Sequence, residues 1–419
     1  MDFIYHLVHK FAIMKNNKNN IMRTNMKILI SFLVLLLFIE CTSSNENDIN
    51  SNLAILDSTQ EHPEKWIDLQ EIADVEYIPL ETTDESLISL GVYFDISDKY
   101  IITMDHYGPI HFFNREGEYL RTINKYGQGP HEHINNHYIA VDFDKEEYYV
   151  DDRRKIQVYS FNGDWKRTLK MPTNMFHDNL FHYNEKYLIT NNRYDDYVHL
   201  EKSPIDKMPY YLIDKENGAH TSLPITIENR ISRVFEEKIE RINKNASVLT
   251  SSIVVMSPLL ANNNDFLIAD YGIDTLYSLK NNKLTPIAVQ SPPVHSNNPP
   301  TVISPMHYTE QFLTFKFVNM TYIPEYPNQI VDEAPMMMWN RKTNEIFRVK
   351  LYDSNLEKKE IKQDMRAQQI EQNNCIIVRY RAESLLEMYE AGYLKGKIKH
   401  ITSGLKFDDN DVIAIYKLK

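Results

Sequence analysis

Histidine, tyrosine and arginine side chains recur directly after short apolar segments that end in aspartate. Such segments lead into Asp105, Asp151 and Asp270. Aromatic rings and guanidinium groups around a pit suit a planar or sugar-like ligand, because rings stack on it and arginine donates paired hydrogen bonds. The side chains that follow the aspartates, which we interpret as candidate binding residues, are His106, Tyr107, Asp152, Arg153, Arg154 and Tyr271.

A glycine-rich loop supplies a second polar group. Its turn residues and the polar side chains after them are Gly127, Gly129, Pro130, His131, Glu132 and His133. We predict that this group belongs to the same binding face, since loops carry sites more often than strands do. The alternative is that the charged side chains, Arg153 and Arg154 among them, are solvated loop residues.

A metal site at the histidines is the weaker interpretation. His131, His133 and His137 have a spacing that a metal could use. No cysteine or HExxH helix accompanies them, and zinc needs three or four ligands in tetrahedral geometry. We therefore interpret them as ordinary loop histidines and predict no cofactor.

No catalytic motif accompanies these residues. The sequence has no GxSxG elbow, P-loop or CxxC, and no helix follows Gly127-Gln128-Gly129 to bind a phosphate. The recurring Asp105, Asp151 and Asp270 favour a structural role, because a residue repeated at one position usually closes a turn through backbone N–H groups. A pair of glycosidase carboxylates stays open, since their separation is a three-dimensional quantity.

The candidate residues sit on an internal repeat. Without a gap, Asp105 aligns with Asp151, Gly117 with Gly163, Tyr119 with Trp165 and Arg121-Thr122 with Arg167-Thr168, each pair 46 residues apart. A fixed period of this length, written as short strands and glycine turns, is typical of a radially repeated all-β protein.

Each copy predicts four antiparallel strands, which is one propeller blade. An apolar strand ends in aspartate, a β-branched and aromatic strand starts at Ile110 or Ile156, and a glycine turn leads to a last strand. In strands a to d of such blades, the b-to-c loops and the loops from d to the next a emerge on one face of the disc. That loop face therefore collects the candidate residues.

The rest of the chain predicts a six-bladed propeller over residues 66–419. We expect Trp66–Leu80 to open it and to close the ring by pairing with Val412–Leu418, because a ring of sheets is open only where its first and last blades meet. Asn229–Asn245 has apolar residues at helical spacing and predicts a short helix, and Ala382–Phe407 predicts a helical excursion.

The N-terminal residues predict export. Met1–Asn25 lacks an apolar period and indicates a misplaced start before Met22 or Met26. Ile28–Ile39 is too short to span a membrane and fits a signal-peptide core, and Cys41 follows it as the residue to be lipidated. We expect residues 1–41 to be leader and 42–65 an acidic tether.

Charge and cysteine usage limit the partners. Removal of Met1–Glu40 leaves 41 basic and 56 acidic side chains. A surface with this net charge repels phosphate backbones and anionic lipid head groups, so we expect no nucleic-acid partner. With Cys41 acylated, Cys375 has no disulfide partner, and its apolar strand predicts a buried structural thiol.

These motifs resemble those of NHL-type propellers and, more closely, six-bladed β-propeller lipoproteins of unknown function from gut-dwelling Gram-negative bacteria. That family carries a G-x-G-P-G-E-Y loop, matched here at Gly127, Gly129, Pro130 and Glu132 with histidines at 131 and 133. It also tends to end in a D-N-P-V-L-x-x-Y-x-L-K strand, matched at Asp409, Asn410, Val412, Tyr416, Leu418 and Lys419. The resemblance implies fold and compartment, whereas a propeller hosts many functions.

Two functions are compatible with this pattern, and a third class, a scaffold for a neighbouring outer-membrane transporter, stays open. The first is a monomeric outer-membrane lipoprotein that presents its loop face to a glycan, peptide or envelope protein. The second is an enzyme of the gluconolactonase-like or lyase-like propeller type, with a divalent cation in an acidic central pit. Three or more inward acidic or asparagine side chains around one point would favour the enzyme, and an aromatic and arginine lining would favour binding.

Overall fold

We analysed a computed structural model of the chain, which divides into two compact units, Met1–Asn52 and Leu53–Lys419. The second unit contains the residues that the structure describes. These are 53–88, 91–105, 108–134, 138–152, 155–172, 175, 177–192, 206–231, 234–236, 239–243, 246–249, 252–254, 257–263, 265–320, 334–356, 360–361 and 374–419.

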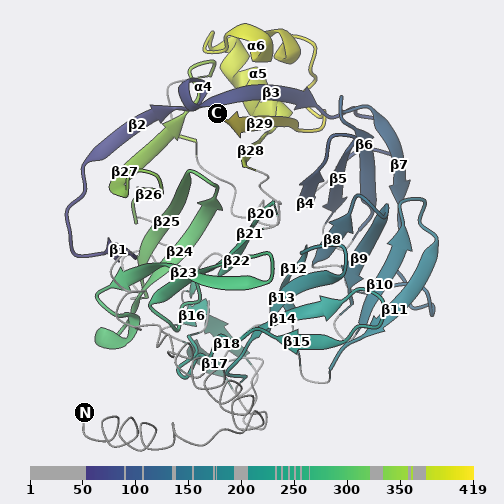
Figure 1. The fold of residues 1–419 in the computed structure, drawn as a ribbon. Coiled ribbons are helices and arrows are strands. Elements are labelled where there is room, and N and C mark those ends of the chain that lie inside the picture. The colour runs from purple at the N-terminus through teal and green to yellow at the C-terminus, as the bar shows by residue number, and fades with distance from the viewer. Residues whose placement is uncertain are drawn as a thin grey trace, which may run out of the picture. The chain divides into compact units, whose positions relative to one another are not determined.

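Six sheets radiate around a centre, and the first three are four-stranded and antiparallel (Figure 1). Blade one consists of β4 (Gly91–Ile96), β5 (Tyr100–Asp105), β6 (Ile110–Asn114) and β7 (Tyr119–Ile123). Blade two consists of β8 (Ile139–Asp142), β9 (Glu147–Asp151), β10 (Lys155–Ser160) and β11 (Trp165–Lys170). Blade three consists of β12 (His177–His182), β13 (Tyr187–Asn192), β14 (Tyr210–Asp214) and β15 (His220–Ser222).

Blades four and five each add an N-terminal strand in parallel to their outer edge. Blade four consists of β20 (Leu259–Asn262), β21 (Asp265–Ile268), β22 (Thr275–Lys280) and β23 (Lys283–Ser291), with β1 (Ala54–Asp57) outside them. Blade five consists of β24 (Thr301–Tyr308), β25 (Phe312–Asn319), β26 (Met337–Asn340) and β27 (Glu345–Tyr352), with β2 (Glu64–Asp68) outside them. A 3₁₀ turn, η3 (Val294–Ser296), leads from blade four to blade five.

Blade six joins the two ends of the chain. Its described strands are β28 (Cys375–Tyr380), β29 (Val412–Leu418) and β3 (Ala73–Pro79). The C-terminal β29 pairs antiparallel with β28 on one side and with the N-terminal β3 on the other. The predicted closure of the ring by strands from both termini is therefore confirmed, as is the six-bladed fold.

Among the described residues, six apolar clusters lie between the blades, one for each pair of neighbours, and a smaller seventh cluster surrounds Tyr271. Phe112 of blade one packs on Tyr148 of blade two, and both are fully buried. Because each sheet is covered on both faces, its central strands are apolar without alternation, as Tyr148–Val150 shows. Cys375 is buried between blades six and one, where burial raises the pKa of its thiol, in agreement with a structural role.

The repeated glycines are contact points between blades. Gly117 and Gly163 end the turns between the third and fourth strands of blades one and two, both with positive φ as predicted. Gly117 lies against the end of β3, where an added Cβ would come within 2.2 Å of the Pro79 carbonyl oxygen. Gly163 similarly lies against Ile123 of the preceding blade. The same contact between neighbouring blades therefore recurs with the 46-residue period.

The repeated arginines make the same joint from the other side. Arg121 on β7 donates to the Phe161 carbonyl of the next blade at 3.1 Å. Arg167 on β11 donates to the Lys215 carbonyl at 2.9 Å, at the equivalent turn of blade three. Each arginine thus ties the outer strand of one blade to the hairpin turn of the next.

The structure corrects the predicted start of the propeller. The stretch Trp66–Leu80 is divided by a one-turn helix, α4 (Leu69–Ile72), whose N-cap Asp68 accepts a hydrogen bond from the Gln70 N–H. Its two halves serve blades five and six rather than one strand. The sheets also begin at Ala54, within the range 42–65 that the sequence assigns to the tether.

The helix predicted at Asn229–Asn245 is wrong. Within this range the structure has strands β16 (Val234–Glu236) and β17 (Ile239–Asn243), and residues 229–231 are in neither a helix nor a strand. They pair with β19 (Ser252–Val254) and β18 (Ala246–Leu249), so nearby partner strands outweigh the helical spacing of the apolar residues. The excursion at Ala382–Phe407 does form helices, α5 (Ala382–Glu390) and α6 (Gly396–Thr402).

Candidate binding loops

The topology fixes which connections carry the candidate residues. The β5–β6, β9–β10 and β21–β22 connections are b-to-c loops, and the glycine loop joins β7 to the innermost strand of the next blade. This arrangement agrees with the predicted loop face. His106, Tyr107, Arg153, Arg154, His137 and Cys41 lie outside the described residues.

The glycine loop is built around Glu132. Its carboxylate accepts a hydrogen bond from the Gly129 N–H at 2.7 Å. An added Cβ on Gly127 would come within 2.0 Å of the same carboxylate, so a side chain there would displace Glu132. The two glycines are therefore needed to let Glu132 fold back under its own loop.

Strand β10 holds the loop from below. Gln157 donates to the carbonyls of Pro130 and Glu132 at 3.2 and 3.0 Å, and Tyr159 donates to the His131 carbonyl at 3.0 Å. Alternate residues of a strand point to one side, so this face of blade two is a row of donors for the loop. These three hydrogen bonds therefore hold the glycine loop on the side of blade two that faces blade one.

His133 belongs to this glycine loop. It is buried, and its Nδ1 lies 3.3 Å from the Tyr159 hydroxyl. Burial lowers the pKa of His133 to about 4, so the imidazole is neutral at physiological pH. The side chain supports the loop and does not face solvent.

Asp152 ties the glycine loop to the b-to-c loop of the same blade. Its carboxylate accepts the Ile134 N–H at 3.0 Å and pairs with the Lys155 ammonium at 3.3 Å. Lys155 also reaches the Glu132 carbonyl at 3.4 Å. The structure therefore brings Glu132 and Asp152 together, as the predicted loop face requires.

Exposed aromatic and apolar side chains lie beside these two joined loops. The His131 ring packs on the Trp165 ring at a tilt of 38°, with ring centroids 4.0 Å apart, and the Trp165 indole N–H donates to Gln157 at 3.2 Å. Trp165 remains 39% exposed, Tyr126 50% and Ile134 53%. The sequence did not mark Trp165 as a candidate. In the repeat Trp165 aligns with Tyr119, which is partly buried in the structure, and both positions are predicted strand residues. The one available signal is the change from tyrosine to tryptophan within the repeat.

Tyr271 does not join these rings at the surface. It is 3% exposed and packs with Val294, Val302 and Met320. The neighbouring Asp270 accepts hydrogen bonds from the Gly272 N–H at 2.9 Å and the Tyr210 hydroxyl at 2.8 Å. This Asx-type turn agrees with the structural interpretation of the repeated aspartates.

The other two repeated aspartates pair with buried histidines. Asp105 lies 3.7 Å from His111 of its own blade, and Asp151 lies 3.5 Å from His177 of the next blade. All four side chains are almost fully buried. One of these contacts lies within blade one and the other lies between blades two and three.

Residues 51–417 match the family described as Domain of unknown function (DUF4934). The chain belongs to this family. The fold is similar to that of a putative exported protein from Bacteroides fragilis, with a TM-score of 0.59, 14% identity, and coverage of 87% of this chain and 99% of that one. A member of the DUF4221 family from Bacteroides vulgatus is more distant, with a TM-score of 0.45, 11% identity, and coverage of 83% and 97%. No curated protein matches the chain.

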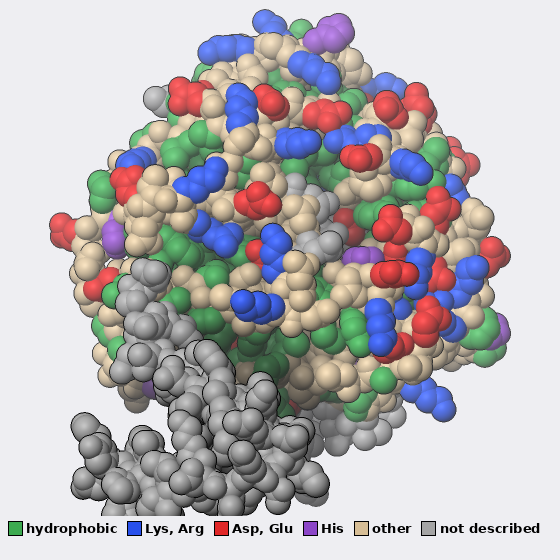
Figure 2. All heavy atoms as spheres, viewed as in Figure 1, with side chains coloured by type: hydrophobic (Ala, Val, Ile, Leu, Met, Phe, Trp, Pro, Cys, Tyr) green, Lys and Arg blue, Asp and Glu red, His purple; other side chains and the backbone are tan. Residues whose placement is uncertain are grey.

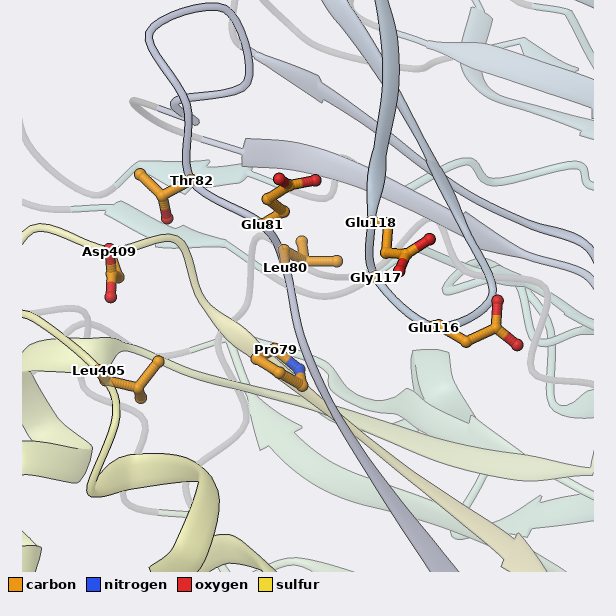
Figure 3. A pocket seen from close by; sticks show the side chains of 9 residues that line it. All are labelled: Pro79, Leu80, Glu81, Thr82, Glu116, Gly117, Glu118, Leu405 and Asp409. Carbon is orange, nitrogen blue, oxygen red and sulfur yellow. The ribbon is translucent and has the colours of Figure 1, made fainter.

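The DUF4934 domain also has a pocket of about 340 Å³ where blades six and one meet (Figure 3). Figure 3 shows Leu405 and Asp409 on the blade-six side, opposite the turn Glu116–Glu118. The Glu81 carboxylate accepts the Tyr119 N–H at 2.7 Å, and Asp409 accepts the Lys406 N–H at 2.7 Å. These carboxylates organise the closing seam. No sequence pattern marked this pocket.

The visible face of the domain mixes both charges. Figure 2 shows acidic and basic side chains interspersed with apolar ones, without a field of one sign across the face. Among the residues that the structure describes, no three His, Cys, Asp or Glu side chains are grouped as metal ligands. Within the same residues, no helix is long and apolar enough to cross a membrane.

Proposed function

We propose that this DUF4934 protein is an envelope-anchored binding protein that presents the loops of blade two to a glycan, peptide or protein partner. The observation that carries the proposal is the joint between the two predicted loops. Asp152 bonds to the glycine loop through the Ile134 N–H, and Lys155 contacts both loops. Two loops held together in this way lose little conformational entropy when a partner binds.

The exposed rings support a binding role. The indole N–H of Trp165 is used inside the protein, so the part left to solvent is apolar ring surface next to His131. Aromatic surface of this kind stacks on sugar rings and peptide side chains. The sequence assigns Arg153 and Arg154 to the b-to-c loop, and guanidinium groups on that loop would add hydrogen bonds to a partner.

Export is supported independently of the loops. The apolar Ile28–Ile39 followed by Cys41 has the order of a lipoprotein leader. The described propeller begins after it, at residue 53. The putative exported protein of Bacteroides fragilis shares the fold. Lipidation of Cys41 would then place the protein in the outer membrane.

Binding is tested on a panel of glycans and peptides with paired variants. Trp165→Ala should weaken binding at least about tenfold, because a buried aromatic contact contributes about 1.5 kcal/mol or more. Arg153→Ala with Arg154→Ala should weaken it as well. Trp66→Ala is the matched control, since Trp66 is 45% exposed on β2 at the outer edge of blade five.

Two results would contradict the proposed site. Binding that survives Trp165→Ala but fails in the Trp66 variant would move the site to the opposite side of the ring. Binding that requires an added divalent cation, with turnover of the ligand, would favour the enzyme instead.

Anchoring is tested by fractionation of cells. The wild-type protein should sediment with the envelope, and Cys41→Ser should release it to the soluble fraction, since acyl chains hold it at the membrane. A wild-type protein that is soluble after cell breakage would contradict lipidation.

A further inference from the structure

The helical insertion of blade six carries a basic segment in an acidic chain. Residues 391–407, between α5 and the turn before β29, contain four lysines, one histidine and no acidic residue, whereas the whole chain has a net charge of −12. The four lysines, none of which has an ion-pair partner among the described residues, are Lys395, Lys397, Lys399 and Lys406.

Packing turns this charge outward. Ile398 and Thr402 of α6 are buried against the core between blades five and six, while Lys397, Lys399 and His400 are exposed. Figure 1 places α6 at the outer edge of the ring, and Figure 2 shows Lys, Arg and His side chains gathered there. We call the exposed side chains of residues 393–407 the basic cap.

Aromatic side chains stand among these lysines. Phe407 is 67% exposed, the highest value among the large apolar side chains that the structure describes, and Tyr393 is 46% exposed. Lysines that reach phosphates, beside aromatic rings at the level of the headgroups, are typical of surfaces that lie on a membrane. Acidic side chains lie on both sides of this segment: Glu383, Glu387 and Glu390 belong to α5, and Asp408 and Asp409 follow Phe407 in the turn before β29.

The N-terminal strands run along the outer edge of the ring toward the blade that carries the basic cap. The N-terminal strands β1, β2 and β3 follow the outer edges of blades four, five and six in turn. The insertion packs on this same belt, since Leu385, Leu394 and Ile398 share a cluster with Leu69 and Tyr77. Only residues 42–52 separate Cys41 from the described chain, and 11 residues span at most about 39 Å.

We propose that the basic cap is a second membrane contact, which binds the headgroups of anionic phospholipids and inserts Phe407 at their boundary. The contact fixes which edge of the propeller faces the membrane. This proposal rests on the proposed function in one respect only. Anchoring in the envelope is the reason to choose a membrane, and not a soluble polyanion, as the source of the anionic groups. The cap itself needs neither Cys41 nor a partner on the loops of blade two.

The test uses the chain from Asn45 to Lys419, without leader or lipid. This chain keeps the whole compact unit Leu53–Lys419, with all blades and both closing strand pairs. In flotation assays it should bind vesicles with about 30% phosphatidylglycerol, and binding should be lost as ionic strength rises from about 0.05 to about 0.5 M. Vesicles of phosphatidylcholine alone should not bind it.

Two variants locate the contact. Each lysine near an anionic surface contributes about a fivefold factor, so Lys397→Gln with Lys399→Gln should weaken binding about 25-fold. Phe407→Ser should weaken it about tenfold at all salt concentrations, because insertion of an apolar ring is not screened by salt. The matched control is Lys283→Gln with Lys342→Gln, two exposed lysines elsewhere on the propeller.

Several outcomes would overturn the proposal. They are an absence of vesicle binding at low salt, equal binding to neutral vesicles, and equal losses in the cap and control variants. Stronger binding to soluble dextran sulfate than to the anionic vesicles would assign the cap to a free polyanion instead. None of these results depends on Cys41, so they are distinct from a failure of lipidation.

Discussion

Asn410 is the side chain through which the two ends of the chain hold each other, and its removal gives the sharpest test of ring closure. It is 3% exposed and stands just before β29. Its amide oxygen accepts the Ile88 N–H, and its amide nitrogen donates to the carbonyls of Glu81 and Ser86, all at 2.9 Å. One side chain therefore fixes the segment that leads from blade six into blade one.

The expected loss for Asn410→Ala follows from these three bonds. The Ser86 side is fully buried, so its carbonyl is left without a partner, whereas water can reach the groups at Ile88 and Glu81. At about 1 kcal/mol for a bond that water replaces and somewhat more for the buried one, the unfolding free energy falls by about 3 kcal/mol. In a domain of this size that corresponds to about 4 °C in melting temperature.

Thermal and urea unfolding of the chain from Asn45 measure the loss, and limited proteolysis shows where it acts. New cleavage should appear near Ile88, because the segment is no longer tied to the C-terminus. Asn297→Ala, at an exposed asparagine, should change the unfolding free energy by less than about 0.5 kcal/mol. If Asn410→Ala melts within about 1 °C of the parent without new cleavage, the reasoning from these bonds is refuted.

Two further perturbations test the joints and the buried histidines. Gly117→Ala should cost several kcal/mol more than Gly392→Ala, since both glycines have positive φ but only the first meets a carbonyl oxygen at 2.2 Å, and equal melting temperatures would contradict the joint. Burial lowers the pKa of His133, His182 and His307 to about 4, so the unfolded chain binds more protons below about pH 6.5. Stability present at neutral pH should therefore fall on acidification, by about 4 kcal/mol at about pH 5.5, and His307→Gln should remove about a third of this slope in urea titrations. A protein that gains stability between about pH 6.5 and 5 would contradict the assignment.

Local pattern was enough to predict the blades. The positive φ of Gly117 and Gly163 follows from the turn chemistry, and the ends of Val412–Leu418 agree with those of β29. The N-terminal belt could not be predicted in this way. Parallel pairing of β2 with β27 joins residues more than 280 positions apart, and the sequence Glu64–Asp68 shows only that a strand is favoured.

Two loops that the sequence singled out adjoin in the structure, but the burial of their side chains was not predicted. The sequence placed Glu132 and Asp152 on adjoining loops, which the structure brings together. It also placed His133 on the binding face, although the structure buries this side chain beside Tyr159. Burial of a loop side chain depends on how neighbouring blades meet, and a single copy of the repeat does not contain that information.

The repeat itself separates structure from function in this chain. Positions that recur every 46 residues, such as Gly117 with Gly163 and Arg121 with Arg167, make contacts between blades. Under the proposed function, a partner would therefore be recognised where the copies differ. The loop after Asp105 reads HYGP and the one after Asp151 reads DRRK. Tyr119 is half-buried against Phe113, whereas its counterpart Trp165 is exposed beside His131. The differences within the repeat thus converge on blade two, where the two loops are joined.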